Sequence, residues 1–168
     1  QVFMAICIGI SQGSQPILGF NYGAEKYSRV RQTYRYSVTL CTVIATIFFI
    51  CFQFFPHQIV GIFGNGSDLY FHFAEKYLRI FMLMTFANGI QPMSACFFTS
   101  IGKARLGVIM SLTRQVLFLL PLIVIFPVFF GIDGVMYAGP IADTSAFVLA
   151  VVFARRELGV MKAAEQNA

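Results

Sequence analysis

Long apolar segments separated by short, positively charged loops constrain the fold of this chain more than any other feature. About 20 apolar residues are needed to cross a hydrocarbon core of about 30 Å, and about five segments of that length can be drawn. They are Val2–Tyr22, Tyr36–Phe55, Tyr77–Ile101, Leu106–Phe130 and Ile132–Ala154. Only 11% of the residues are charged, whereas an ordinary soluble domain is about 25% charged. The sequence therefore predicts an all-α, polytopic transmembrane helix bundle.

The basic residues are distributed unevenly between the two sides of the predicted bundle. Ten of the 12 fall on one side, namely Lys26, Arg29, Arg31, Arg35, Lys103, Arg105, Arg114, Arg155, Arg156 and Lys162. The other two, Lys76 and Arg79, have Asp68 and Glu75 nearby. By the positive-inside rule the ten mark the cytoplasm, which predicts a multi-pass protein of the inner (plasma) membrane with a cytoplasmic C-terminus. Topology also explains the net charge of +5 without a nucleic-acid partner.

The two ends of the chain and its last turn carry further expectations. Gln1 lies inside an apolar segment, without an initiator Met or a signal peptide, so we expect the chain to be a portion of a longer protein. The stretch Gly131–Gly134 predicts a tight hairpin that makes the last two segments antiparallel neighbours. The tail after Arg156 is polar and is expected to fray.

No enzymatic motif is found in the sequence. It contains no HExxH, GxSxG or Walker loop. The four cysteines lie inside apolar segments and form no CxxC pair, as expected of small buried hydrophobes. We therefore predict no catalytic residue, no metal site and no cofactor, so the chain is not expected to be an enzyme.

Asp143 is the most informative single residue. It lies about 11 residues into the last segment, which at 1.5 Å per residue is about 16 Å deep. An ionised carboxylate at that depth is costly, and such residues usually face a cavity or a partner. One interpretation is a coupling site for a proton or a cation. The other is a structural ion pair with a neighbouring donor, either Arg114 or Arg79.

Four side-chain amides lie within the apolar segments: Gln12, Gln15, Asn88 and Gln91. Such amides can hydrogen-bond between helices and so hold a bundle together. They can also line a substrate path, because Gln15 and Gln91 each precede a proline and proline interrupts the helical hydrogen bonds. Both interpretations remain open, and the second makes all four candidate substrate-binding residues.

The third segment is rich in methionine and phenylalanine. Soft, adaptable side chains suit a pocket that accepts several ligands, and we select Met84 and Phe97 as candidate substrate contacts. Most residues of this kind are expected instead to face lipid or the interior of the bundle.

The stretch from Gln12 to Ala24, QGSQPILGFNYGA, followed by Arg29 and Val30, resembles the multidrug and toxic compound extrusion (MATE) family, and most of all its MepA-like bacterial branch. Shorter matches follow in the family's order: Gly102–Ala104, Ser111–Gln115 and Gly131–Val135. The resemblance implies one lobe of a protein with twelve transmembrane helices in two six-helix lobes. Residues 1–156 would then be a partial C-terminal lobe, from the eighth helix through the twelfth, and 157–168 a cytoplasmic tail.

The resemblance also implies a function, the export of cationic or aromatic drugs in exchange for Na⁺ or H⁺. The expected partners are the lipid bilayer, small-molecule drugs and the N-terminal lobe of the same transporter. The stretch matching the eighth helix lacks the acidic residue that some branches carry there, so Asp143 is selected for its depth and not for a motif. A lipid-linked oligosaccharide flippase is an alternative, disfavoured by the scarcity of basic residues deep in the segments. A non-transporting membrane scaffold subunit is a second alternative.

Overall fold

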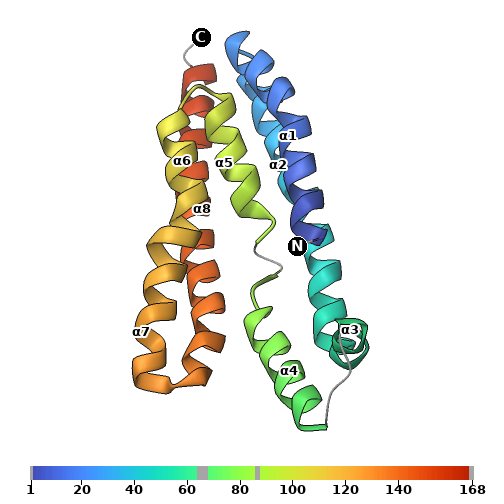
Figure 1. Ribbon diagram of the computed structural model, residues 1–168. Helices are drawn as coiled ribbons and strands as arrows, with labels where there is room; N and C mark the ends of the chain where they lie inside the picture. Colours follow the sequence, from blue (N-terminus) through green and yellow to red (C-terminus); the bar gives the residue numbers. More distant parts are fainter. Residues whose placement is uncertain (1, 64–67, 86–87, 167–168) are drawn as a thin grey trace.

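The computed structural model describes residues 2–63, 68–85 and 88–166, and within these ranges the chain is helical without any strand. The elements, drawn in Figure 1, are α1 (Val2–Gly23), α2 (Tyr27–Phe54), α3 (Pro56–Phe63), α4 (Asp68–Phe81), α5 (Ile90–Ser100), α6 (Ala104–Leu112), a π-helical segment η2 (Thr113–Leu119), α7 (Leu120–Phe130) and α8 (Ile132–Gln166). The predicted all-α bundle is confirmed.

Four of the five predicted spans correspond to single long helical runs. In the described part of the chain, the helices long and apolar enough to cross a membrane are Val2–Gly23, Tyr27–Phe54, Ala104–Phe130 and Asp133–Gln166. The continuous span predicted at Tyr77–Ile101 is wrong, because α4 and α5 are separated by residues 82–89. Residues 86–87 of this stretch lie outside the described residues.

Two features of the structure explain why the helix is interrupted before α5. Pro92 lies in the first turn of α5, where its missing N–H would have no helical partner in any case. Gly89, just before α5, lies so close to α2 that a Cβ atom would be 2.8 Å from the carbonyl oxygen of Cys41. The close approach of the two backbones fixes the point at which α5 begins.

Two helices extend well beyond the apolar segments that predicted them. The helix predicted to begin at Tyr36 begins at Tyr27, so Arg29, Arg31 and Arg35 are helical. The prediction that the tail frays after Arg156 is wrong, because α8 continues to Gln166 and Met161 is only 2% exposed. Residues 167–168 of the predicted tail lie outside the described residues. Hydropathy marks where a helix leaves the hydrocarbon, and not where the helix ends.

The turn between α7 and α8 confirms the predicted hairpin. Gly131 is the residue that joins the two helices, and its φ of 59° is in the region that favours glycine. The two helices then run side by side in opposite directions (Figure 1).

The core is concentrated at one end of the bundle, which we call the basic end. There Arg31 pairs with Glu165 at 2.6 Å and Lys103 with Glu157 at 2.5 Å, which ties the starts of α2 and α6 to the end of α8. The helix ends that these pairs join lie in the upper part of Figure 1, and the main cluster of buried side chains comes largely from the same parts of the helices. It contains Leu18, Val30, Tyr34, Met93, Phe97, Phe98, Ile101, Met110, Ala150, Ala154 and Met161.

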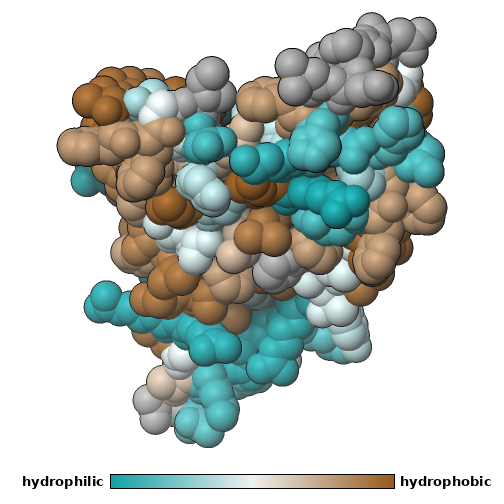
Figure 2. Space-filling view, turned by 90° about the horizontal axis from the view of Figure 1, so that it is seen from below, coloured by the Kyte–Doolittle hydropathy of each residue, from teal (hydrophilic) through white to brown (hydrophobic). Residues whose placement is uncertain are grey.

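The opposite end of the bundle is more open. Helix α7 has no buried residue among those described, and Val128 and Phe129 are 80% and 74% exposed. Figure 2 shows this end, with hydrophobic side chains over much of the face and hydrophilic ones gathered in separate groups. An apolar helix surface of this kind suits contact with lipid or with another helical layer.

Candidate functional site

Asp143 lies about a third of the way along α8 and is 3% exposed. Both of its carboxylate oxygens accept hydrogen bonds. Arg114 donates from Nε to Oδ1, and Asn88 donates from Nδ2 to Oδ2 at 2.7 Å. We call these three residues the Asp143 cluster. Of the two predicted partners, Arg114 is therefore the one that pairs with Asp143, and the charge of each is neutralised by the other.

Two departures from regular α-helix place the partners of Asp143. Arg114 lies on the π-helical segment η2, whose wider turn departs from the regular α-helix and is frequently found at functional sites. Asn88 lies in the interruption between α4 and α5, so a non-helical segment between two helices supplies the second donor. Within a membrane, unwound backbone is tolerated only where it is buried in protein or lines a water-filled cavity.

A groove lies beside the cluster, between α1, α5 and α6. Its larger part, about 410 Å³, is lined by Ile8, Ser11, Gln12, Gln15, Pro92, Ala95, Cys96, Thr99, Gly107, Val108 and Ser111. Its smaller part, about 130 Å³, is lined by Met4, Gln91, Pro92, Ala95, Ser111, Arg114 and Gln115. Because Pro92, Ala95 and Ser111 line both parts, we treat them as one feature, the amide groove. Arg114 belongs both to this groove and to the Asp143 cluster.

The predicted amides are divided between these two features. Gln12 and Gln15 are exposed on the groove, and within the described residues neither side chain has a hydrogen-bond partner. Gln91 is 7% exposed and donates from Nε2 to the carbonyl of Met110 at 3.1 Å, while still lining the smaller part. Asn88 does not line the groove and belongs to the Asp143 cluster. Of the four, Gln12 and Gln15 are the ones whose side-chain amides make no hydrogen bond to a described residue.

The two candidate substrate contacts of the third segment do not line the groove. Phe97 is fully buried in the main core and packs on Tyr34, with ring centroids 4.7 Å apart. Met84 is partly exposed in the turn after α4. Phe97 is thus placed as a packing residue, and Met84 is on a different part of the chain from the amide groove.

Sequence reasoning did not select Ser111 and Gln115 as site residues, although the stretch Ser111–Gln115 is one of the motifs that resemble the family. They are four positions apart, which places two polar side chains on one helix face near Arg114. That spacing is the signal that would have found them.

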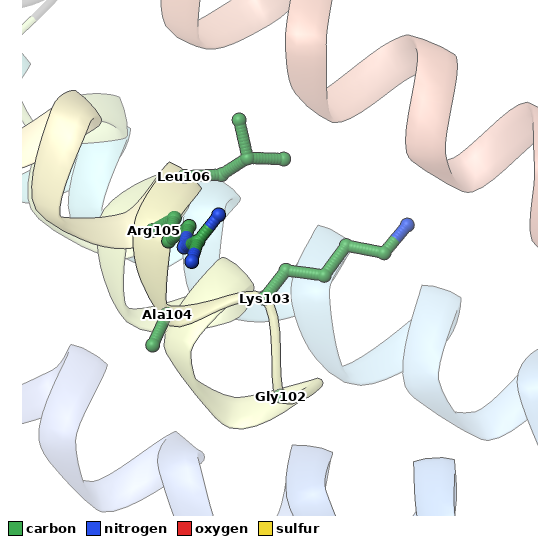
Figure 3. Close-up of a pocket in the computed structure, with 5 residues that line it drawn as sticks. All are labelled: Gly102, Lys103, Ala104, Arg105 and Leu106. Carbon is green, nitrogen blue, oxygen red and sulfur yellow. The ribbon is translucent and has the colours of Figure 1, made fainter.

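A separate hollow of about 360 Å³ lies at the basic end, in the turn from Gly102 to Leu106. Figure 3 shows Lys103 and Arg105 leaving this turn in different directions. Because Lys103 reaches Glu157 at 2.5 Å, this turn serves to tie α6 to α8. In the described part of the chain there is no group of three His, Cys, Asp or Glu side chains that could hold a metal ion.

Comparison with protein families gives a match to the family MatE over residues 1–138. Among curated proteins, the chain is 26% identical over 161 residues to the multidrug export protein MepA of Staphylococcus saprophyticus, covering 94% of this chain and 35% of that protein. It is 22% identical over 162 residues to a FAD transporter of Shewanella oneidensis, covering 96% of this chain and 36% of that protein. The chain thus spans about a third of the length of these relatives.

Solved structures give the same fold. The MATE multidrug transporter DinF-BH is 35% identical with a TM-score of 0.86, over 95% of this chain and 35% of that one. A MATE family transporter of the MOP superfamily in an inward-facing conformation has a TM-score of 0.86 at 16% identity, over 96% of this chain and 38% of that one. A structure of such a transporter in an outward-facing conformation has a TM-score of 0.84 at 18% identity, over 94% of this chain and 36% of that one.

Proposed function

The chain belongs to the MatE family, and from this premise we propose that the full-length protein is an ion-coupled antiporter of the inner membrane. It exports cationic or aromatic drugs and other toxic compounds in exchange for H⁺ or Na⁺. Its described helices would form part of the C-terminal lobe, with the C-terminus in the cytoplasm and an N-terminal lobe of the same protein as partner. The relatives described above are named for transport and not for an enzymatic reaction.

The observation that carries this proposal is the continuity between the amide groove and the Asp143 cluster. Arg114 lines the groove and also donates a hydrogen bond to Asp143. A substrate in the groove and an ion at Asp143 would therefore both act on the same guanidinium group. Such a shared element gives each ligand a way to change the energy of the other's bound state, which is what coupling between two ligands means.

The roles within the groove follow from which polar groups are free. Gln12 and Gln15 offer donors and acceptors that no described residue satisfies, so they suit hydrogen bonding to a substrate. Ligand pockets usually combine apolar walls with a few such polar groups, and Ile8, Pro92 and Val108 supply the apolar walls here. We assign the groove to substrate and regard Gln12 and Gln15 as the residues that orient it.

The role of Asp143 follows from its present partners. A cation that coordinates Asp143 competes with the Arg114 guanidinium group for the negative charge of the carboxylate, since Arg114 is bonded to Oδ1. A proton neutralises the carboxylate and so removes the attraction that holds Arg114. In either case binding of the coupling ion would release Arg114 toward the groove. Protonation or Na⁺ binding at Asp143 would then alter the surface that the substrate meets.

The experiment that tests this proposal is dye accumulation in cells that express the full-length protein. We expect the wild type to lower accumulation of ethidium, and Asp143→Asn to abolish that effect at an equal level of membrane expression. Asp133→Asn is the matched control, because Asp133 lies on the same helix with 57% of its side chain exposed. If Asp143→Asn exports dye as well as the wild type does, the proposed coupling role is wrong.

The substrate class has a second candidate, which the relative named as a FAD transporter favours. Arg114, Ser111 and Gln115 lie together in the smaller part of the groove and offer donors to an anionic or carbonyl-bearing ligand. Export of flavin dinucleotide from loaded vesicles, without dye export, would support this substrate over drugs.

Protection from thermal unfolding by a lipid-linked oligosaccharide alone would instead support a flippase. A partner protein that dissociates in Asp143→Asn, with all transport intact, would support a scaffold.

A further inference from the structure

Two hollows lie along α2, away from the amide groove. A hollow of about 370 Å³ is lined by Ser28, Arg31, Gln32, Arg35 and Tyr36 at the basic end of this helix. A second hollow, of about 360 Å³, is lined by Val38, Thr39, Thr42, Val43, Thr46 and Ile47. The two follow each other along α2, since Tyr36 and Val38 are within one helical turn, or about 5.4 Å. One hollow is basic and the next is largely apolar.

The basic hollow has unsatisfied capacity to bind an anion. Arg31 donates from Nη2 to Glu165 at 2.6 Å, but its buried Nη1 has no hydrogen-bond partner among the described residues. Buried polar groups of native proteins are nearly always hydrogen-bonded, so such a group points to a missing acceptor. Arg35 is four residues on, on the same helix face, and has no ion pair with a described acid. Glu165 neutralises at most one of the two guanidinium groups.

The second hollow is apolar in spite of its threonines. Thr42 donates to the carbonyl of Val38 at 2.8 Å, and Thr46 to that of Thr42 at 2.7 Å. Because these hydroxyl groups are bonded within their own helix, the polar capacity of the surface is largely used. Above and below them an exposed apolar stripe runs along α2, consisting of Tyr36, Leu40, Val43, Ile47, Ile50 and Phe54.

We propose that this face of α2 binds one anionic phospholipid, with its phosphate in the basic hollow and its acyl chain along the apolar one. Charge selects the headgroup, since two arginines face one acid. The apolar hollow in line with it selects a lipid over free phosphate. Tyr36, 67% exposed between the two hollows, fits the level of the headgroups, where tyrosine is enriched. Basic pockets on transmembrane helices are a known means of holding such lipids. This site depends on the membrane position of α2 and not on which compound is exported.

The test measures lipid binding to the purified full-length protein by native mass spectrometry, with phosphatidylglycerol and phosphatidylcholine as probes. We expect the wild type to prefer phosphatidylglycerol, and Arg31→Gln/Arg35→Gln to bind it at least about fivefold more weakly, since each basic residue near an anionic surface contributes about that factor. The control Arg155→Gln/Arg156→Gln removes the same charge from two exposed residues outside the hollow and should change binding by less than about twofold.

Two further arms keep the test decisive. Arg35→Gln alone leaves the Arg31–Glu165 pair intact and should still weaken phosphatidylglycerol binding, so a folding defect in the double variant is not fatal to the test. Thr42→Phe fills the apolar hollow and should weaken lipid binding as well. If inorganic phosphate displaces the lipid, or if Thr42→Phe binds it unchanged, the site takes a free anion and the lipid proposal is wrong. Equal loss in the control double variant, or no preference in the wild type, also overturns it.

Discussion

The Asp143 cluster and the amide groove are neighbouring polar features with opposite bonding states. In the cluster, a carboxylate that is 3% exposed has a donor on each oxygen, and an arginine compensates its charge. In the groove, Gln12 and Gln15 are exposed and have no hydrogen-bond partner among the described residues. The two features meet at Arg114.

This difference separates the effect of a polar residue on the stability of a membrane helix bundle from its capacity to bind a ligand. A buried group whose bonds are all internal stabilises one arrangement, and breaking it leaves a charge unpaired. A polar group whose donors and acceptors are unpaired can be removed with little loss of stability, and it is available to bind a ligand. We therefore expect mutations in the cluster to act first on stability, and mutations in the groove to act on transport alone.

The largest effect is expected for Arg114→Met. This change keeps most of the side-chain volume but leaves Asp143 buried without its cation, which typically costs about 3–5 kcal/mol of the free energy of unfolding. The measurement is thermal or denaturant unfolding of the full-length protein in detergent. The double variant Arg114→Met/Asp143→Leu should regain most of the loss, because no charge is then left unpaired.

The matched control for this pair is Lys76→Met. Lys76 and Asp133 are 3.7 Å apart with 53% and 57% of their side chains exposed, so their pair should contribute less than about 1 kcal/mol. If Lys76→Met and Arg114→Met destabilise the protein equally, the cluster is not the closed structural unit described above.

An intermediate effect is expected for Asn88→Ala. The change removes the donor to Oδ2 of Asp143 while leaving Arg114 in place, and an unsatisfied buried acceptor costs about 1–3 kcal/mol. Asn21→Ala provides the control, because Asn21 donates at 2.8 Å to the carbonyl of Ile17 in an exposed position. We expect the control to change the unfolding midpoint very little. An Asn88→Ala protein as stable as the wild type would mean that water replaces the amide, and that the cluster is open like the groove.

The sequence predicted the members of these two features better than their grouping. The depth of Asp143 follows from counting residues along an apolar segment, and Arg114 was one of two possible partners. Choosing between Arg114 and Arg79 requires the rotation of each helix about its axis, which the π-helical segment at Thr113–Leu119 changes. No periodic pattern of single residues encodes that wider turn.

The remaining differences have equally specific causes. The interruption before α5 depends on contact between Gly89 and the backbone of Cys41, two positions far apart in sequence. Phe97 was selected as a candidate substrate contact because it lies in a segment rich in adaptable Met and Phe side chains. In the structure it packs on Tyr34 instead. The extent of α2 and α8 was underestimated because charged residues end an apolar run without ending a helix. For the start of α5 and for Phe97, the missing information was a contact between segments distant in the chain.

The smallest effect on stability, combined with a clear effect on transport, is expected for Gln12→Leu/Gln15→Leu. Neither side chain has a described hydrogen-bond partner to lose, so the free energy of unfolding should change by less than about 0.5 kcal/mol, as for most surface substitutions. If each amide contributes one hydrogen bond to the substrate, the apparent affinity for dye should fall by about 2–10-fold per residue. Gln58→Leu, an exposed glutamine on α3 outside the groove, should alter neither quantity. If Gln12→Leu/Gln15→Leu exports dye as well as the wild type does, the groove has no role in substrate binding. A large loss of stability would instead mean that both glutamines have hydrogen-bond partners in the intact transporter. The groove would then be as closed as the Asp143 cluster.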